Sequence, residues 1–419
     1  MRSSTLVRPG LALLLAAGLG TLAPTGAAQA ETVPAATSTA DAPITFTSTE
    51  QLAPGVTYGS FQVNTPRGVT VGYLLTADLR KNKVSLDLLH PDAVAQREVV
   101  SAMTNAQGAV AGVNGDFFNI SETHTGVAPT GSASGPEIAD GEDLKFAVPN
   151  AQRFGPGLAP RTSTRDVFGV GVNGKARVDT LSLAGEVRSE KGTIALDGLN
   201  QYALPVGGVG VFTSEWGTAN RVRSTCGSDT SRLDPCSTHT YEVTVRDGVV
   251  TSVSSTPGTG SIPSDTQVLV GREAGADALD DLAVGDRVEV DEKLVSAGKP
   301  KLTFAVGGAP ILRDGQPLAG LDTKTAAVRS SAGVSADGRT VYLVALAGRA
   351  PASAGFTIAE LADLMGKLGA DAAVNLDGGG STTIAVKEPG QPAATARNNP
   401  SDGTERAVAN GIGIFIGRD

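Results

Sequence analysis

The sequence predicts an α+β fold with a mainly antiparallel β-sheet core, a few helices and an inserted β-rich subdomain. Three observations predict it. Apolar residues recur in short alternating runs, the pattern of half-buried strands. The 53 glycines and 23 prolines among 419 residues supply many turns, while aromatic residues make up only 4%. Only one segment carries a well-marked helix signature, so alternating βαβ units are not expected.

The first thirty residues, 1–30, have the pattern of a secretory signal peptide. Two arginines precede an apolar run at 11–22, and an A-x-A site follows at 28–30. A retained anchor is the alternative, but the run is shorter than the ~20 apolar residues that span a bilayer, and no later segment approaches that length. We therefore expect cleavage near Ala30, a secreted, extracellular protein without a transmembrane segment, and a flexible linker at 31–43.

Residues 44–419 are expected to form one domain. Alternating apolar residues predict strands near its start, and a strand that ends at Asn114 follows a helix stopped by Gly108. The expected strands are 69–75, 84–88 and 109–113, and the expected helix is 96–107.

The middle of the chain divides into loops and a β-rich insertion. Residues 121–163 are rich in Gly, Pro, Ser and Thr, which predicts long loops. Residues 165–300 return to strands and are interpreted as an inserted β-rich region. The Asp247-Gly248 pair between two strand-like runs indicates a hairpin. The strands expected here include 243–245, 268–270 and 288–290.

The C-terminal part contains the one strong helix signal. Thr357 and Glu360 form a T-x-x-E capping box, and apolar residues then lie on one helical face up to the stop at Gly369. A buried strand is expected at 372–376.

The two cysteines, Cys226 and Cys236, flank a polar, turn-rich stretch. In an exported chain this arrangement predicts a local disulfide. A zinc site is not expected, because a CxxC spacing and a second ligand pair are missing. His124 is either an acid–base group of a pocket or a solvated loop residue.

The charge balance excludes nucleic acid as the partner. The chain has 34 Lys and Arg against 43 Asp and Glu, a formal charge of −9, and it has no long basic runs. Affinity for the phosphate backbone comes largely from clustered cations.

The most pointed motif is Asp377 followed by three glycines and three hydroxyl residues, between two apolar strands. Consecutive glycines let backbone N–H groups approach an anionic oxygen, and the hydroxyls add donors. The motif is neither a P-loop nor a G-x-S-x-G elbow, because the lysine and the last glycine are absent. A glycine-rich hairpin turn is the alternative. The expected anion-binding residues are Gly378, Gly379, Gly380, Ser381 and Thr382.

A second motif, Asn114-Gly115-Asp116-Phe117-Phe118, also follows a strand. Ordinary Asn-Gly turn chemistry is one interpretation. In the other, Asn114 and Asp116 face a pocket, where Asp116 and Asp377 meet as base, acid or metal ligands.

Two arginines could supply positive charge. Arg329 and Arg406 each lie among small residues, and such an arginine can hold an anion with two hydrogen bonds. The alternative is a surface ion pair, for Arg406 with Asp402 or Glu405.

These motifs, in this order, resemble the phosphodiester glycosidase family. The residues that carry the resemblance are GVNGDFF (112–118), PTG (129–131), VGGAPIL (306–312), VRSSAG (328–333), NLDGGGSTT (375–383) and NNPSDGTERAVANGIG (398–413). The chain departs from the family pattern at Val328 and Ser330, where P-R-T is common around the arginine. It also has Ala347-Gly348-Arg349 where the family often has Asp-Gly-Arg, so alanine replaces the aspartate.

The resemblance implies hydrolysis of the bond between a sugar C1 and a phosphodiester oxygen, as in a GlcNAc-1-phosphodiester, with a carbohydrate phosphodiester as the partner. Asp377 and Asp116 would act as general base or transition-state stabiliser, Asn114 would orient sugar or water, and Arg329, Arg406 and the glycine segment would hold phosphate. Two alternatives stay open: a non-catalytic binder of cell-wall or exopolysaccharide phosphodiesters, and a metal-dependent phosphodiesterase that cuts P–O. A divalent cation between the two aspartates fits the last.

Overall fold

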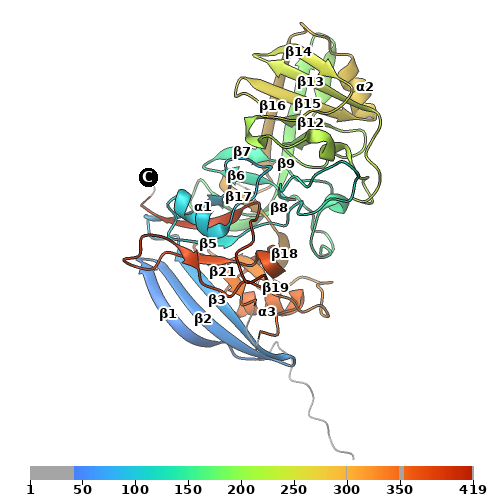
Figure 1. The fold of residues 1–419 in the computed structure, drawn as a ribbon. Helices are drawn as coiled ribbons and strands as arrows, with labels where there is room; N and C mark the ends of the chain where they lie inside the picture. The colour runs from blue at the N-terminus through green and yellow to red at the C-terminus, as the bar shows by residue number, and fades with distance from the viewer. Residues whose placement is uncertain (1–41, 299, 349–352, 418–419) are drawn as a thin grey trace, which may run out of the picture. The chain divides into compact units, whose positions relative to one another are not determined.

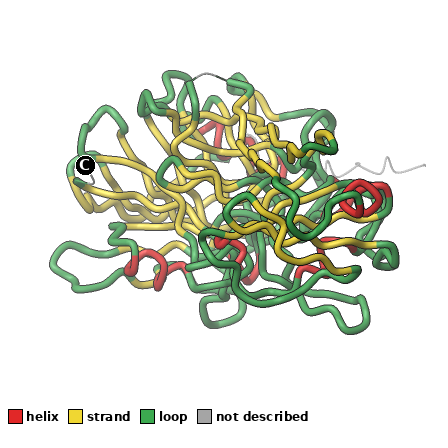
Figure 2. The backbone as a smooth tube through the Cα atoms, turned by 90° about the horizontal axis from the view of Figure 1, so that it is seen from above, coloured by secondary structure: helices red, strands yellow, loops and turns green. Residues whose placement is uncertain are grey.

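The structure is a computed structural model that describes residues 42–298, 300–348 and 353–417. The expected signal peptide and most of the expected linker lie outside the described residues. Antiparallel β-sheet dominates, with short helices among strands and loops (Figure 2), so the predicted fold class is confirmed. The helices are α1 (Val100–Ala106), α2 (Ala274–Asp280) and α3 (Ile358–Lys367), with 3₁₀ turns η2 (Asn150–Gln152), η3 (Ser214–Trp216), η4 (Arg221–Thr225) and η5 (Gly379–Ser381).

The first sheet has eight antiparallel strands in the order β1-β2-β3-β21-β20-β22-β18-β19 (Figure 1). Its strands are β1 (Thr45–Ala53), β2 (Val56–Thr65), β3 (Gly68–Asp78), β21 (Thr340–Leu346), β20 (Ser330–Val334), β22 (Ala372–Asn375), β18 (Ala309–Arg313) and β19 (Gln316–Pro317). Helix α3 packs on one face through Leu361 and Met365, next to Phe356. The predicted capping box is confirmed, since Thr357 accepts from Glu360 N–H and Glu360 accepts from Thr357 N–H.

The second sheet has five antiparallel strands in the order β24-β23-β5-β25-β4. They are β24 (Thr395–Ala396), β23 (Ile384–Val386), β5 (Ala111–Asn114), β25 (Gly411–Ile416) and β4 (Val84–Leu89). Apolar side chains of this sheet and of the first sheet, among them Val113, Ile384 and Val374, share one buried cluster. Burial of this apolar surface is the main favourable term that holds the two sheets together.

The third sheet has the order β10-β9-β8-β17-β6-β7, and β16 pairs with β9. Its strands are β10 (Gly192–Ala195), β9 (Ala176–Ser189), β8 (Asp166–Gly171), β17 (Leu302–Gly307), β6 (Glu137–Ala139), β7 (Glu142–Lys145) and β16 (Val288–Ser296). The strands at 137–145 and 302–307 therefore share a sheet with strands of the region 165–300.

The fourth sheet lies wholly within the region 165–300 and has the order β11-β12-β15-β13-β14. Its strands are β11 (Gly198–Leu199), β12 (Val209–Phe212), β15 (Thr266–Arg272), β13 (Thr240–Arg246) and β14 (Val249–Ser254). The predicted hairpin joins β13 to β14, and Asp247 and Gly248 both have positive φ, at 47° and 73°. Two positive φ angles are what a type I′ turn requires.

Two sequence-based expectations were wrong in detail. The helix expected over 96–107 begins only at Val100, because the backbone of Glu98 exchanges hydrogen bonds with Val408 and so stays extended. The region 121–163 is not all loop, because β6 and β7 form a hairpin whose turn, Asp140-Gly141, again has positive φ at both residues.

Candidate functional site

The segment between β22 and β23 crosses from the first sheet to the second. Strand β22 pairs with β18 and β20, while β23 pairs with β5 and β24. The two strands therefore do not form a hairpin, and the glycine-rich segment is not a hairpin turn. Asp377 lies just after Leu376 in this crossing, where its N–H donates to Gly115 O at 2.9 Å. The two predicted motifs thus meet where the sheets join.

Asn114 ties the junction together from the end of β5. Its side chain donates to Asp377 O at 2.7 Å and accepts from the Ser330 hydroxyl at 2.6 Å and from Thr383 N–H at 3.1 Å. The residue is completely buried. Because its amide is engaged with the chain itself, the geometry supports a role in placing Asp377. Direct orientation of sugar or water by Asn114 stays a prediction.

Asp116 is a deeply buried carboxylate. One carboxylate oxygen accepts from Phe117 N–H at 2.8 Å and the other from Gly135 N–H at 2.5 Å. Burial raises its pKa above the ordinary aspartate value, against the lowering effects of the Gly135 N–H and of the Lys145 and Arg153 charges. N–H groups hold both oxygens, which favours the charged form of Asp116 against the effect of burial.

Asp377 is less enclosed than Asp116, and its pKa is also raised. Burial raises its pKa from 3.8 to about 6, the Asp116 charge raises it further, and the Ser381 hydroxyl, Gly378 N–H and Arg406 lower it. One oxygen accepts from Gly378 N–H at 2.9 Å. A carboxyl poised near neutral pH beside a second carboxylate is suited to acid–base chemistry.

In the glycine segment, side-chain polar groups are more available to a ligand than the backbone N–H groups. The N–H groups of Gly378, Gly379, Ser381 and Thr382 all donate to acceptors of the chain itself. These four amides are therefore used within the chain, and anion binding by the segment stays a prediction. In contrast, several buried polar side-chain atoms here have no hydrogen-bond partner among the described residues: both amide atoms of Asn375 and the hydroxyls of Thr382 and Thr383. Buried polar groups are normally paired, so this cluster points to a ligand or water.

The structure brings Arg406 to the glycine segment. A Cβ at Gly380 would lie 2.1 Å from Arg406 Nη2 and 2.2 Å from Asp402 Oδ2, so glycine is required for this approach. Arg406 also pairs with Asp402 at 2.6 Å, the partner expected in the surface-pair alternative. Its side chain is one-third exposed, which leaves it reachable from solvent.

Arg329 points elsewhere. It precedes β20, and its guanidinium donates to Thr325 O at 2.8 Å and Phe356 O at 3.2 Å. Burial lowers its pKa, and the Asp322 charge opposes that. Its backbone is close to the site, because a Cβ at Gly378 would meet Val328 O at 2.5 Å. A phosphate contact from Arg329 stays a prediction.

Three charged residues of the neighbourhood were missed by the sequence reasoning. Lys145 is completely buried and donates to Gly135 O and Phe146 O, and burial lowers its pKa to about 8. Glu137 is buried and accepts from Asn410 at 2.6 Å. The Asp-Gly pair at 140–141 marks the hairpin that carries both residues.

The third missed residue is Arg153, which interacts electrostatically with both Asp116 and Asp377. It follows the short turn η2 in the loop region, and its guanidinium lies 5.3 Å from the centroid of the Phe117 ring. No local sequence pattern distinguishes it from other loop arginines.

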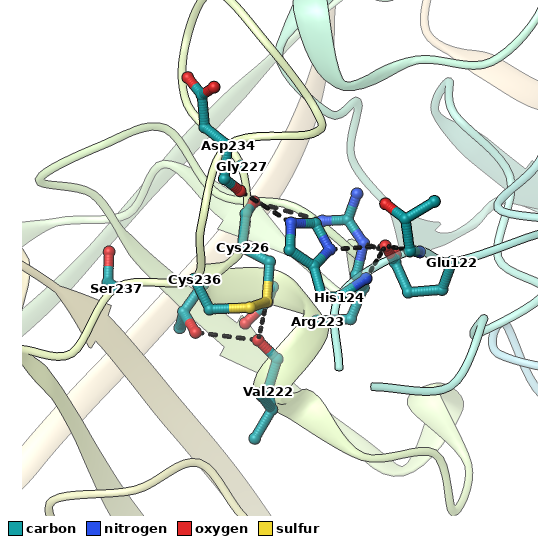
Figure 3. The surroundings of a disulfide bond; sticks show 12 residues. Glu122, His124, Val222, Arg223, Cys226, Gly227, Asp234, Cys236 and Ser237 are labelled. Carbon is teal, nitrogen blue, oxygen red and sulfur yellow. Dashed lines mark hydrogen bonds and ion pairs between the residues drawn. A yellow bond between two sulfur atoms is a disulfide. The ribbon is translucent and has the colours of Figure 1, made fainter. Parts of the chain in front are cut away.

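The predicted disulfide between Cys226 and Cys236 is confirmed. His124 lies beside it and is bound to the Glu122 carboxylate at 2.5 Å and to Asp234 O at 2.7 Å (Figure 3). The ligand atoms of His124 and the two cysteines gather within 4.8 Å, but the bonded sulfurs are not available as thiolates. We therefore assign this cluster a structural role.

A cavity of about 380 Å³ lies away from the two catalytic candidates. Asp166, Asp179, Arg313 and Asp371 are among the residues that line it. Asp116 and Asp377 are not part of this lining, so cavity size does not mark them.

Comparison with known sequences gives one family match. Residues 239–415 match the phosphodiester glycosidase family. The match confirms the resemblance noted in the sequence, and it includes Arg329, Asp377 and Arg406, while Asn114 and Asp116 precede it. No curated protein matches the chain.

Two solved structures share the fold of this chain, and a third was compared with it. A hypothetical protein from Synechocystis is 22% identical, with a TM-score of 0.67. The match covers 89% of this chain and 64% of the Synechocystis chain. The chain thus spans 64% of that relative's length. An exported-protein candidate from Burkholderia pseudomallei K96243 is 21% identical, with a TM-score of 0.66. The match covers 89% of this chain and 97% of the Burkholderia chain. The third structure is the catalytic domain of zebrafish N-acetylglucosamine-1-phosphodiester alpha-N-acetylglucosaminidase, auto-inhibited by its pro-peptide. It is 14% identical, with a TM-score of 0.42, and the match covers 90% of this chain and 88% of the zebrafish chain.

Proposed function

We propose that the protein is a secreted hydrolase that cleaves the C1–O bond of a sugar-1-phosphodiester and releases sugar and a phosphomonoester. One observation carries the proposal: Asp377, whose pKa is raised to about 6, bonds to Gly115 O next to the buried Asp116, at a junction with the unpartnered Thr382 and Thr383 hydroxyls. The family match over 239–415 supports the reaction class.

The reaction needs little acid assistance, because the phosphodiester oxygen leaves as a stabilised anion. Asp377 takes a proton from water, the water oxygen bonds to C1, and the C1–O bond breaks with its electron pair moving to the phosphate oxygen. The proton returns to solvent from Asp377. Asp116, whose oxygens are both held by N–H groups, stabilises the cation-like sugar electrostatically.

Phosphate is held by groups around the glycine segment. Arg406 packs directly on Gly380, and the buried Thr382 hydroxyl has no partner among the described residues, next to the Ser381 hydroxyl that interacts with Asp377. An arginine and two hydroxyls match the anionic, acceptor-rich surface of a phosphodiester.

Export is part of the proposal. The N-terminal pattern favours it, and a disulfide is stable outside the reducing cytosol. In the described part of the chain, the helices are all too short or too polar to span a bilayer.

The test is hydrolysis of a panel of α-sugar-1-phosphodiesters in ¹⁸O-labelled water, with and without chelator. The proposal requires label in the released sugar and none in the phosphomonoester. Label in the phosphate, with sugar-1-phosphate as product, would instead establish P–O cleavage. Loss of turnover with chelator would show that the reaction needs a divalent cation. Binding of the panel without any product would make the protein a carbohydrate phosphodiester binder.

A further inference from the structure

The segment that carries Arg153 is held from outside by the disulfide-closed loop 226–236. Three consecutive residues make the contact. The Gln152 side chain donates to Ser228 O at 2.6 Å, Arg153 O accepts from Arg232 Nη1 at 3.4 Å, and the Phe154 ring lies 4.3 Å from the Arg232 guanidinium.

The loop itself is anchored on both sides of the disulfide. Gly227 N–H donates to Asp234 O at 3.0 Å inside the loop, and Gly227 O accepts from Arg272 at 2.8 Å. His124 Nε2 donates to Asp234 O, while Arg223 and Glu122 form an ion pair next to the sulfurs (Figure 3). The loop is therefore a rigid support.

The Arg153 side chain extends from this contact to the Phe117 ring. Its guanidinium donates to Pro156 O and lies over the Phe117 ring, next to Asp116 in sequence. A Cβ at Gly155 would meet the same ring at 2.5 Å, so the turn packs closely against it. The arginine is half-buried, which keeps its charge partly desolvated and effective.

We propose that Arg153 is a substrate-phosphate-binding residue of the site, and that the disulfide loop 226–236 positions it through Gln152, Arg232 and Phe154. This inference rests on the proposed function. It gives the β-rich region 165–300, which supplies the loop, a role in the site. Arg153 contacts substrate, whereas Arg232 is a positioning residue that acts through Arg153.

Steady-state kinetics separate these roles. Arg153→Ala is expected to raise KM about tenfold or more, and Arg153→Lys is expected to recover part of that loss because it keeps the charge. Arg232→Ala is expected to raise KM three- to tenfold with kcat within twofold. Leu233→Ala, at the next and 63% exposed residue, is the matched control and should leave both constants unchanged.

Hydrogen exchange tests the loop independently of turnover. Reduction of the disulfide, or Arg232→Ala, should speed exchange of the amides of 150–155 at least tenfold while those of β5 keep their protection. Unchanged exchange and KM in Arg232→Ala would overturn the positioning role. Uniform loss of protection on reduction, with Arg232→Ala silent, would reduce the disulfide to a general stabiliser.

Binding of inorganic phosphate, measured by calorimetry, distinguishes failure of this inference from failure of the proposed function. If the protein hydrolyses nothing but binds phosphate, and Arg153→Ala weakens that binding about tenfold, the reaction is wrong and Arg153 stands as an anion ligand. If Arg153→Ala leaves phosphate binding and KM unchanged, the inference is wrong even if hydrolysis is found.

Discussion

Two aspartates in one neighbourhood differ because their surroundings differ. Both carboxylates of Asp116 and Asp377 are desolvated, but N–H groups hold both oxygens of Asp116, whereas one such bond is formed to Asp377 Oδ1. Hydrogen bonds to the charged form keep a carboxylate ionised, and burial opposes this. The result is a carboxyl held in place by two N–H groups beside one whose pKa is raised to about 6.

We predict that Asp377→Asn lowers kcat by about 10²–10⁴-fold, the range typical of a lost general base. Asparagine keeps the side-chain shape and can remain next to Gly378, so the protein should stay folded. Turnover on the preferred phosphodiester and the circular dichroism spectrum check this together. Full activity in the variant would remove Asp377 from the mechanism.

The pH profile follows from the same carboxyl. If Asp377 is the base, kcat/KM should rise with pH through about 6 and then level off. Arg406→Gln should move this limb to higher pH, because the Arg406 charge lowers the pKa of Asp377. Arg80→Gln, at a surface arginine paired with Asp78, should leave the limb in place.

The contribution of Asp377 to the free energy of unfolding should fall over the same pH range in which kcat/KM rises. Folding raises the pKa of Asp377 from 3.8 to about 6, so the neutral carboxyl favours the folded state below pH 4, and this contribution is lost as pH rises through 6. Asp377→Asn should therefore add roughly 1–2 kcal/mol of stability at pH 8, after allowance for partial exposure, and little at pH 4. Denaturant unfolding at the two pH values measures it. Equal effects at both would contradict the shift.

At the scale of elements, the site depends on a strand that changes sheets. The chain leaves β22 in the first sheet and enters β23 in the second, and Asn114 bonds to both ends of that crossing. The crossing needs glycine where Arg406 approaches the backbone.

We therefore predict that Gly380→Ala raises KM at least tenfold. The new Cβ would lie within 2.2 Å of both Arg406 Nη2 and Asp402 Oδ2, so the ion pair must move away from the segment. Steady-state kinetics of the variant and the wild-type protein on the preferred phosphodiester measure the effect. Gly157→Ala is the control, because a Cβ there meets nothing within 4 Å. Unchanged KM in Gly380→Ala would show that Arg406 does not hold phosphate.

For the whole molecule, the prediction concerns processing. If the N-terminal pattern is a signal peptide, the exported protein should begin at Glu31, because the A-x-A site ends at Ala30. Mass spectrometry of the protein from the culture medium, before and after reduction, gives both the N-terminus and the Cys226–Cys236 bond. A cell-retained protein that keeps residues 1–30 would contradict export.

Much of the molecule could be predicted because its signals are local. The capping box of α3, the Asp247-Gly248 hairpin and the alternating strands follow from side chains that act on their own backbone. The start of α1 could not be predicted, because Val408, three hundred residues later, holds Glu98 extended. The Asp140-Gly141 hairpin had a readable signal that the surrounding loop composition concealed.

The sequence by itself determined the fold class, the disulfide and the motifs that carry Asp116 and Asp377, since each depends on neighbouring residues. Only the tertiary structure decided that the backbone amides of the glycine segment are used internally, that Arg406 approaches it while the Arg329 guanidinium is held by Phe356 O, and that Arg153 joins the two aspartates. These outcomes depend on desolvation and on contacts between distant segments, because burial sets the pKa values and hydrogen-bond competition sets which groups remain available.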